Sequence, residues 1–180
     1  MHLREAAVTR PDSVRLLSDY FGSRELEFTE AGGVYTTRFP TADAFTPPAG
    51  VFLLVIDDDN AAVGCGGIRL LPRASADDAP GGAGTAAAKR ERGTVSDATP
   101  VRFEVKHVWL GEAARGRGWA IALMNELEER AREFGATQLV LDTNARLTAA
   151  ARLYARLGYD QTEPYNDNAN ATNWYAKQLQ

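Results

Sequence analysis

The sequence predicts one α/β domain in which a mixed β-sheet is flanked by helices. Beyond residue 100 the apolar patterns alternate strand, helix, strand and helix, an order typical of parallel strands joined by helical crossovers. Before residue 72, two apolar segments separated by a short polar turn indicate a β-hairpin. The 180 residues, 44% hydrophobic and 24% charged, suffice for one domain with a substantial core. We therefore expect a single domain over residues 1–180.

The first fifty residues carry the weakest pattern. Residues 3–8 are predicted as a first strand. A helix is expected to start at Asp12 and Ser13, just after Pro11, with an apolar stripe of Val14, Leu16, Leu17 and Tyr20. From residue 22 to 50, aromatic residues are scattered among Gly, Thr and Pro, which indicates a loop-rich segment. This segment either packs as a long loop or serves as a substrate lid, since loops on rigid scaffolds often carry binding residues.

A hairpin follows, with strands over residues 51–56 and 61–71. Its acidic turn, residues 57–60, lacks the ligand spacing and the distal Glu of an EF-hand, so we expect a solvated turn. Residues 74–100 change character, because an Ala/Gly-rich run and a basic cluster at 89–92 offer almost nothing to bury. Such a composition predicts a flexible insertion between strands and not a further domain.

The C-terminal half carries the clearest periodicity. Strands are predicted over 101–110, 138–142, 159–163 and 173–179, and helices over 116–134 and 147–157. The first helix is expected to bury Ala120, Met124, Leu127, Ala131 and Phe134, and the second Leu147, Ala150, Tyr154 and Leu157. On the outer face of the first helix, we expect the i,i+4 ion pairs Glu126–Arg130 and Glu128–Arg132. The helices are expected to end at Gly135 and Gly158.

Charge and cysteine content argue against several classes of protein. The formal net charge is −4, whereas a general nucleic-acid binder or a protein docked on anionic membranes carries a basic excess. The single cysteine, Cys65, cannot form an internal disulfide, and with His2 and His107 it makes no credible metal site. The N-terminus lacks the apolar core of a signal peptide, and no apolar run reaches the roughly 20 residues of a membrane span. We therefore expect a cytoplasmic protein without a metal that binds neither nucleic acid nor membrane.

Residues 115–120, Arg-Gly-Arg-Gly-Trp-Ala, predict an anion-binding turn between a strand and a helix. The glycines let the backbone approach a ligand, and the free N–H groups and dipole of the helix start bind phosphate oxygens. Arg115 and Arg117 add positive charge. The turn lacks the Gly-Lys-Ser/Thr of a Walker loop, and Ile121 stands where a dinucleotide fingerprint has its third glycine. Asp142, at the end of the next strand, still leaves a dinucleotide site open as an alternative.

Two motifs together resemble the GCN5-related N-acetyltransferase (GNAT) superfamily. Arg115, Gly118 and Ala120 match its pyrophosphate signature Arg/Gln-x-x-Gly-x-Gly/Ala, and residues 153–159 match its Leu-Tyr-x-x-x-Gly-Phe/Tyr motif. Residues 64–69 and 141–144 are similar to one branch of the family. The resemblance covers most of the chain. It implies a GNAT-like acyl-CoA N-acyltransferase fold, in which central strands splay apart and open a V-shaped cleft.

The resemblance also implies where acetyl-CoA, the cosubstrate, binds. Its pantetheine would lie in the cleft against the strand backbone of Val108, Trp109 and Leu110. Its pyrophosphate would be held by the backbone amides of Arg115, Gly116, Arg117, Gly118, Trp119 and Ala120. Its far side would be lined by Asn144 and Arg152.

The implied reaction moves an acetyl group from acetyl-CoA to a primary amine of a small molecule or peptide, by direct attack in a ternary complex. Because an amine attacks only when neutral, a base is needed, and Glu104 resembles the glutamate that some members use. Its alternative role is that of an exposed or salt-bridged strand carboxylate, with Lys106 as the candidate partner. A backbone N–H near Leu110 would polarise the thioester carbonyl. Tyr154 would donate a proton to the CoA thiolate, or it serves only in packing.

Further alternatives stay open. The chain is either this enzyme or a catalytically silent CoA-binding or regulatory module of the same fold. Cys65 has glycines on both sides and no evident base, so we expect no nucleophilic role. His107 falls opposite Glu104 if the strand is regular, and a bulge would change that. By resemblance, Asp167 would meet an acceptor ammonium and Trp174 would pack near the cleft. Dimers are common in the family, which makes a homodimer one candidate assembly.

Overall fold

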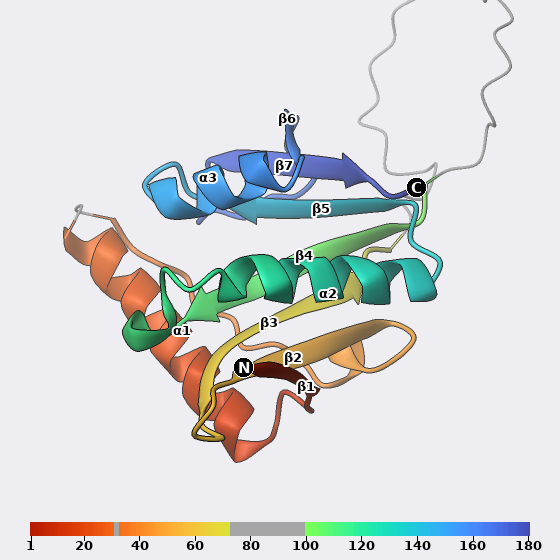
Figure 1. Ribbon diagram of the computed structural model, residues 1–180. Helices are drawn as coiled ribbons and strands as arrows, with labels where there is room; N and C mark the ends of the chain where they lie inside the picture. The colour runs from red at the N-terminus through yellow and green to blue at the C-terminus, as the bar shows by residue number, and fades with distance from the viewer. Residues whose placement is uncertain (31–32, 73–99) are drawn as a thin grey trace, which may run out of the picture.

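A computed structural model describes residues 1–30, 33–72 and 100–180 and contains a seven-stranded sheet (Figure 1). The strand order is β1-β2-β3-β4-β5-β7-β6. The strands are β1 (His2–Glu5), β2 (Gly50–Ile56), β3 (Ala62–Leu70), β4 (Arg102–Leu110), β5 (Gln138–Thr143), β6 (Asp160–Thr162) and β7 (Asn173–Gln178). β4 and β5 run parallel and the other neighbouring described strands antiparallel, so the predicted mixed α/β fold is confirmed. The predicted insertion at 74–100 lies outside the described residues except for Pro100.

Helices cover both faces of this sheet. They are α1 (Pro11–Glu30), α2 (Trp119–Glu133) and α3 (Thr148–Arg156), with the short 3-10 helices η1 (Asp43–Phe45) and η3 (Glu112–Ala114). α1 packs on one face of the central strands and α2 on the other (Figure 1). None of the helices in the described ranges is long and apolar enough to cross a membrane.

β2 shows how the core forms on both faces. All its residues are buried. Those packed with α2 are Val51, Leu53 and Val55, and those packed with α1 are Phe52, Leu54 and Ile56. Because successive side chains of a strand point to opposite faces, a strand covered on both faces has a continuous apolar sequence.

The two central parallel strands part after three residue pairs. β4 pairs with β5 at Arg102–Gln138, Phe103–Leu139 and Glu104–Val140, although β4 continues to Leu110 and β5 to Thr143. On its other edge, β5 pairs with β7 along its whole length. The splayed central strands implied by the sequence are therefore present.

A bulge in β4 lies where the strands part. The register with β3 moves from Gly67–Lys106 to Cys65–Trp109, so β4 has one extra residue there. His107 takes the left-handed backbone conformation, with φ of 58°. As in other bulges of this kind, two neighbouring side chains then reach the same face of the sheet. His107 consequently lies on the α1 face with Lys106, and the regular alternation, which placed it opposite Glu104, does not hold.

The N-terminal elements differ in length from those predicted. β1 covers His2–Glu5 instead of residues 3–8, and α1 continues to Glu30 although a loop was expected from residue 22. Phe21 and Phe28 extend the buried stripe of α1, and helix-favouring residues such as Arg24 and Glu27 lie between them. These residues outweigh the helix-weakening effect of Gly22. The loop-rich part is therefore shorter and begins after the helix.

The buried faces of α2 and α3 follow the predicted spacing. The fully buried residues are Leu123, Met124, Leu127, Glu128 and Ala131 in α2 and Tyr154 in α3. Partly buried residues packed against them include Ala120, Phe134, Ala150 and Leu157. Gly135 and Gly158 follow the helices with φ of 80° and 78°, as glycines after a helix commonly do.

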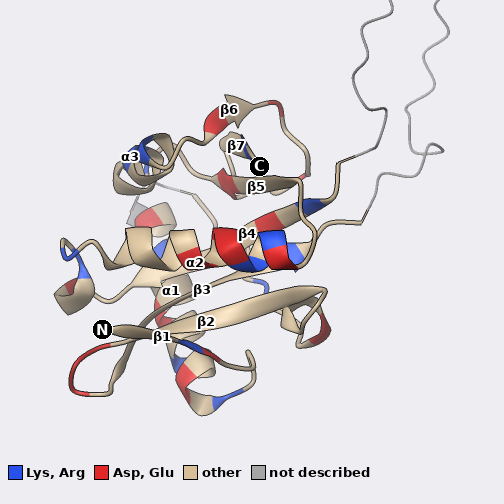
Figure 2. Cartoon of the chain, turned by 45° about the vertical axis from the view of Figure 1, so that its right-hand side comes forward, with Lys and Arg blue, Asp and Glu red and all other residues tan. Residues whose placement is uncertain are grey.

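Charged residues of α2 gather in its C-terminal half (Figure 2). The predicted pair Glu126–Arg130 forms, with Nε 2.9 Å from Oε1. Glu128 was wrongly placed on the outer face. It is 4% exposed and accepts a 2.6 Å hydrogen bond from Lys177 of β7. The predicted ion pair with Arg132 is also present, at 3.8 Å. A cation from a distant strand therefore lets this carboxylate occupy the core side of the helix.

Close packing against β3 predicts the effect of a glycine substitution. A Cβ at Gly67 would lie 2.8 Å from the Phe45 ring and from the Val51 carbonyl oxygen. Gly67→Ala should therefore lower the free energy of unfolding by about 1–3 kcal/mol through overpacking. At Gly22, inside α1, a Cβ meets nothing within 4 Å, so Gly22→Ala should stabilise by about 0.5–1 kcal/mol. Urea unfolding measures both, and equal effects would contradict this packing.

Candidate active site

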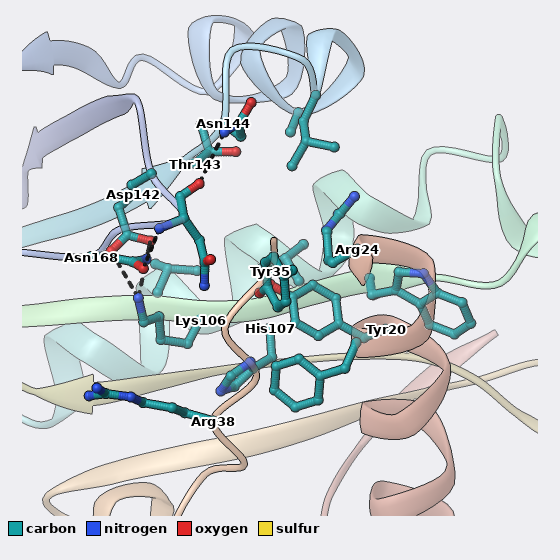
Figure 3. A pocket seen from close by; sticks show the side chains of 18 of the residues that line it. Tyr20, Arg24, Tyr35, Arg38, Lys106, His107, Asp142, Thr143, Asn144 and Asn168 are labelled. Atoms are coloured by element: carbon teal, nitrogen blue, oxygen red, sulfur yellow. Dashed lines mark hydrogen bonds and ion pairs between the residues drawn. The ribbon is translucent and has the colours of Figure 1, made fainter. Parts of the chain in front are cut away.

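A cavity of about 950 Å³ opens where β4 and β5 part. One wall is β4 from Val105 to Leu110, and the opposite wall is formed by Asp142, Thr143 and the turn that leads to α3. Residues 35–41, α1 and the loop at residues 166–171 close one end, and the start of α2 with α3 forms the other. Segments far apart in the sequence thus meet around one space (Figure 3).

Lys106 bridges the two parting strands. Its Nζ lies 3.1 and 3.0 Å from the carboxylate oxygens of Asp142 (Figure 3). It also lies 3.1 Å from Oε1 of Glu104. Burial alone would lower the pKa of Lys106, but the carboxylates of Glu104 and Asp142 raise it above its usual value. Lys106 is therefore charged, and its ion pairs join β4 to β5 where backbone pairing ends.

Glu104 is completely buried in this network. Its Oε2 accepts a hydrogen bond from Nε of Arg69 (2.8 Å) and forms an ion pair with Nη2 of the same guanidinium (2.6 Å). Its Oε1 accepts hydrogen bonds from the Tyr165 hydroxyl (3.0 Å) and Asn166 (3.2 Å), beside Lys106. Glu104 is not among the residues that line the cavity. Both carboxylate oxygens of Glu104 thus have hydrogen-bond partners. The ion pair with Lys106, given above as an alternative role of Glu104, is present. The role of Glu104 as a base stays a prediction.

The carboxylate of Asp142 is hydrogen-bonded to groups of the protein itself. Besides Lys106, it accepts hydrogen bonds from Asn166 (2.7 Å) and Asn168 (3.1 Å). Burial raises its pKa, but the Lys106 charge and these hydrogen bonds lower the pKa overall. The carboxylate is therefore engaged and does not suit a cofactor ribose, and the largely antiparallel sheet differs from a dinucleotide-binding fold. The dinucleotide alternative does not fit.

The C-terminal loop binds the other side of the cavity through its asparagines. Asn166 accepts a 2.9 Å hydrogen bond from the Trp174 indole, and Asn170 exchanges two hydrogen bonds with the backbone of Thr36. Asp167 lines the cavity, whereas Trp174 does not. These asparagines were not predicted as site residues. Their signal in the sequence is an unusually polar run between two strands.

The glycine turn before α2 has the geometry of an anion site. Gly116 and Gly118 take φ of 74° and 77°, and Gly118 is the N-cap of α2. The first turn of a helix leaves backbone N–H groups without intrahelical partners. Arg115 donates from Nε to the Leu110 carbonyl (3.0 Å), and the Arg117 guanidinium lies 5.1 Å from the Trp119 ring centroid. The turn is thereby fixed at the end of β4.

The sequence-predicted residues divide into two groups. The cavity is lined by Val108, Trp109, Leu110, Arg115, Ala120, Asn144 and Tyr154. The other predicted residues do not line it: Glu104, Gly116, Arg117, Gly118, Trp119 and Arg152. Arg152 is exposed on α3, while the glycine turn adjoins Arg115 and Ala120 on the cavity wall. Asn144 donates to the Asn170 carbonyl (3.0 Å) and so also holds the C-terminal loop.

The edge of β4 that faces the cavity has no strand partner in the described sheet beyond Glu104. Val108, Trp109 and Leu110 line the cavity along this stretch of β4, and the Leu110 carbonyl already accepts the hydrogen bond from Arg115. Backbone N–H and C=O groups there need partners, since unpaired buried backbone groups are costly. A ligand with amide groups can supply these partners.

Tyr154 reaches the cavity from α3 and is 7% exposed. Its ring packs at 6.0 and 5.9 Å from those of Tyr159 and Tyr175. Burial raises the pKa of its phenol above the usual value, so the hydroxyl keeps its proton.

His107 lines the cavity and Cys65 is its neighbour on β3, but the environment of neither side chain favours a reactive form. The His107 imidazole packs against Tyr20, Phe21 and Phe45, and burial, followed by the charges of Lys106 and Arg69, lowers its pKa to about 3. It is therefore neutral near pH 7. Cys65 is fully buried, which raises the pKa of its thiol, so no thiolate is available.

Comparison with known proteins decides the family. Residues 15–159 match the model of the Acetyltransferase (GNAT) family, well over half of the chain. The chain belongs to this family. The fold and the acetyl-CoA-dependent chemistry that the sequence motifs imply are therefore those of the GNAT family.

Three curated relatives match parts of the GNAT chain. An uncharacterized N-acetyltransferase of Schizosaccharomyces pombe is 27% identical over 69% of this chain and 60% of its own. Aminoglycoside N(6')-acetyltransferase type 1 of Serratia marcescens is 34% identical over 37% and 45%. The uncharacterized N-acetyltransferase YdgE of Bacillus subtilis is 45% identical over 29% and 34%. The chain thus spans between about a third and three fifths of the length of these relatives.

Solved structures share the fold of this GNAT chain. A GNAT acetyltransferase of Staphylococcus aureus Mu50 superposes with a TM-score of 0.69 at 14% identity, covering 99% of this chain and 100% of the other. A GNAT acetyltransferase of Elizabethkingia anophelis with acetyl-CoA bound gives 0.58 at 15% identity, covering 99% and 97%.

The Lys106 bridge predicts a pH-dependent stability. The pKa of Asp142 is depressed in the folded state, so its contribution is present above the unfolded value of about 3.9 and is lost as the pH falls through the folded value. Asp142→Asn should therefore lower the free energy of unfolding by about 2–3 kcal/mol at pH 7. The difference from wild type should shrink at pH 3, below the unfolded pKa of about 3.9, because Asp142 of the unfolded chain takes up a proton there.

Asp160→Asn is the matched control, because Asp160 is exposed on β6. It should change the free energy of unfolding by less than about 0.5 kcal/mol at either pH. A loss in Asp142→Asn that is the same at pH 7 and pH 3 would show that the ion pair is not its cause.

Proposed function

We propose that this GNAT protein is an N-acetyltransferase that moves an acetyl group from acetyl-CoA to a primary amine. The observation that carries the proposal is the parting of β4 and β5 around a cavity that extends to Arg115 and Ala120, on either side of the glycine turn. The cavity supplies unpaired strand backbone at one point and a helix start at another. These are the two features that an amide-containing chain ending in a diphosphate needs.

The residues present fit acetyl-CoA. Backbone groups at Val108, Trp109 and Leu110 would bind the pantetheine amides, since that edge of β4 is unpaired in the described sheet. Residues 115–120 would bind the pyrophosphate, because Gly118 is the N-cap of α2 and the first turn of a helix leaves backbone N–H groups without intrahelical partners. Arg146 lies on the cavity wall beside Asn144 and would add charge against phosphate oxygens. Acetyl-CoA supplies an activated acetyl group there.

The chain's own groups then have defined tasks. The Leu110 N–H would donate to the carbonyl oxygen of the acetyl group, as the proposed oxyanion donor. Tyr154 would give its proton to the departing sulfur, because it lines the cavity and burial, which raises its pKa, keeps the hydroxyl protonated near pH 7. Glu104 would act through Lys106 and Arg69 by fixing the opening of the strands, since both of its oxygens are already hydrogen-bonded.

Direct attack in a ternary complex is the route that these surroundings favour. One cavity joins the proposed acetyl-CoA end to the end lined by α1 and residues 35–41, which would hold the acceptor. The one cysteine of the sequence is fully buried as a thiol and lacks the surroundings of an acyl carrier. The amine can therefore reach the acetyl group without an enzyme-bound acetyl intermediate.

Gly118 provides a test of the proposed pyrophosphate site. Gly118→Ala should cost about 1–2 kcal/mol of stability, since φ of 77° disfavours a side chain, and should weaken acetyl-CoA binding about tenfold or more. Gly135→Ala, at the other end of α2, introduces the same strain at φ of 80°, and a Cβ there is equally unobstructed. It should leave acetyl-CoA affinity unchanged. Calorimetric titration decides, and equal affinities of the two variants would overturn the assignment.

Tyr154 provides a test of the chemistry. Tyr154→Phe removes the proposed proton donor but keeps the ring, so kcat should fall about 100-fold while acetyl-CoA affinity holds. Tyr175→Phe, which alters the neighbouring ring in the same way, should leave kcat within about twofold. The assay is thiol release from acetyl-CoA over an amine panel. Wild-type protein that binds acetyl-CoA but releases no thiol with any amine would support the silent-module alternative.

A further inference from the structure

The acceptor end of the cavity is aromatic. Its rings come from α1 and from the segment after it, and they are Tyr20, Phe21, Phe28, Tyr35 and Phe39. Their centroids lie 4.8 Å apart for Phe21 and Phe39 and 5.1 Å apart for Phe28 and Tyr35. Phe39 is 52% exposed although it lines the cavity. An exposed ring beside other rings is a contact surface for a flat apolar group.

The charged residues on the cavity wall mostly neutralise one another. The cations are Arg24, Arg38, Arg69, Lys106, Arg115 and Arg146, and the acids are Glu27, Asp142 and Asp167. Arg24 pairs with Glu27 at 2.8 Å. Arg69 pairs with the buried Glu104, and Lys106 with Glu104 and Asp142. Arg115 and Arg146 lie at the proposed acetyl-CoA end.

Two charges at the acceptor end are left without an ion pair among the described residues. Arg38 and Asp167 both line the cavity and are exposed, one on the segment after α1 and the other on the C-terminal loop. In Figure 3, dashed lines join Lys106, Asp142 and Asn168, while Arg38 projects apart from that cluster. The segments of Arg38 and Asp167 are held to each other by the two hydrogen bonds between Asn170 and Thr36.

We propose that the acceptor is a primary amine that carries both an aromatic ring and a carboxylate, such as an aromatic amino acid. This inference rests on the proposed acetyltransferase function and names its substrate class. Arg38 binds the carboxylate, Asp167 meets the ammonium, and the aromatic rings contact the ring of the acceptor. A polycationic amino sugar is disfavoured, because Asp167 is the one cavity acid of the described residues that no cation of the protein neutralises.

The transfer balances for such an acceptor. The ammonium loses one proton to solvent water before it attacks. The new N–C bond of the amide then replaces the C–S bond of the thioester, and the second proton ends on the sulfur. The carboxylate and the ring take no part in these steps and serve only in recognition.

Four amines test the substrate class by the rate of thiol release from acetyl-CoA. L-Phenylalanine has a ring and a carboxylate, phenethylamine lacks the carboxylate, glycine lacks the ring, and kanamycin is a polycationic amino sugar. We expect kcat/KM for L-phenylalanine to exceed each of the other three by about tenfold or more. Equal or higher values for phenethylamine or kanamycin would overturn the inference but leave the acetyltransferase function intact.

Arg38→Gln tests the residue. It should lower kcat/KM for L-phenylalanine about tenfold through KM and leave phenethylamine unchanged, because phenethylamine has no carboxylate to bind. Arg10→Gln, an exposed arginine outside the cavity lining, should change neither. Equal losses for both amines would overturn the role of Arg38. If the wild-type protein binds acetyl-CoA but turns over none of the four amines, the proposed substrate class is overturned. If the wild-type protein does not bind acetyl-CoA, the proposed function is overturned too.

Discussion

The Lys106 ammonium, held between Glu104 and Asp142, is the interaction on which the site depends. It joins β4 to β5 just where their backbone hydrogen bonds stop. Strands that part in a protein interior leave N–H and C=O groups without partners, which is costly. β7 pairs with the other edge of β5, so beyond Glu104 and Val140 the edges of β4 and β5 that face each other have no strand partner in the described sheet. A buried ion cluster adds little net stability because desolvation offsets its attraction, but here it fixes where the sheet opens.

The bulge of β4 adds a second side chain, that of His107, to the face of the sheet that carries Lys106. Without the extra residue, Lys106 and its neighbour would point to opposite faces of the sheet. Lys106 shares the face of Glu104 by regular alternation, and the extra residue lets His107 pack among the α1 rings on that face. A left-handed conformation at a residue other than glycine costs of order 1–3 kcal/mol and persists only when its surroundings enforce it. The rings around His107 are those surroundings.

The sequence predicted features with local signals and missed those that depend on distant contacts. The left-handed Gly118 at the start of α2 follows from residues 115–120 alone. The position of Glu104 beside the cleft could also be predicted, but its partners Arg69 and Tyr165 lie 35 and 61 residues away. No pattern within a strand records such contacts. The extension of α1 past Gly22 was missed for the same reason, since the surface that covers its aromatic residues is built by β3 and β4.

The two ends of the cavity use different chemistry, which explains why one is easier to assign than the other. The proposed acetyl-CoA end depends on backbone geometry, namely an unpaired strand edge and a helix start, and a short motif is enough to specify both. The acceptor end depends on side chains from three separate segments. There, charges that neutralise one another stabilise the walls, and those left without partners are free to select a ligand. Recognition of the acceptor thus depends on charged side chains that have no ion-pair partner in the described residues, and these can be identified only in the folded cavity.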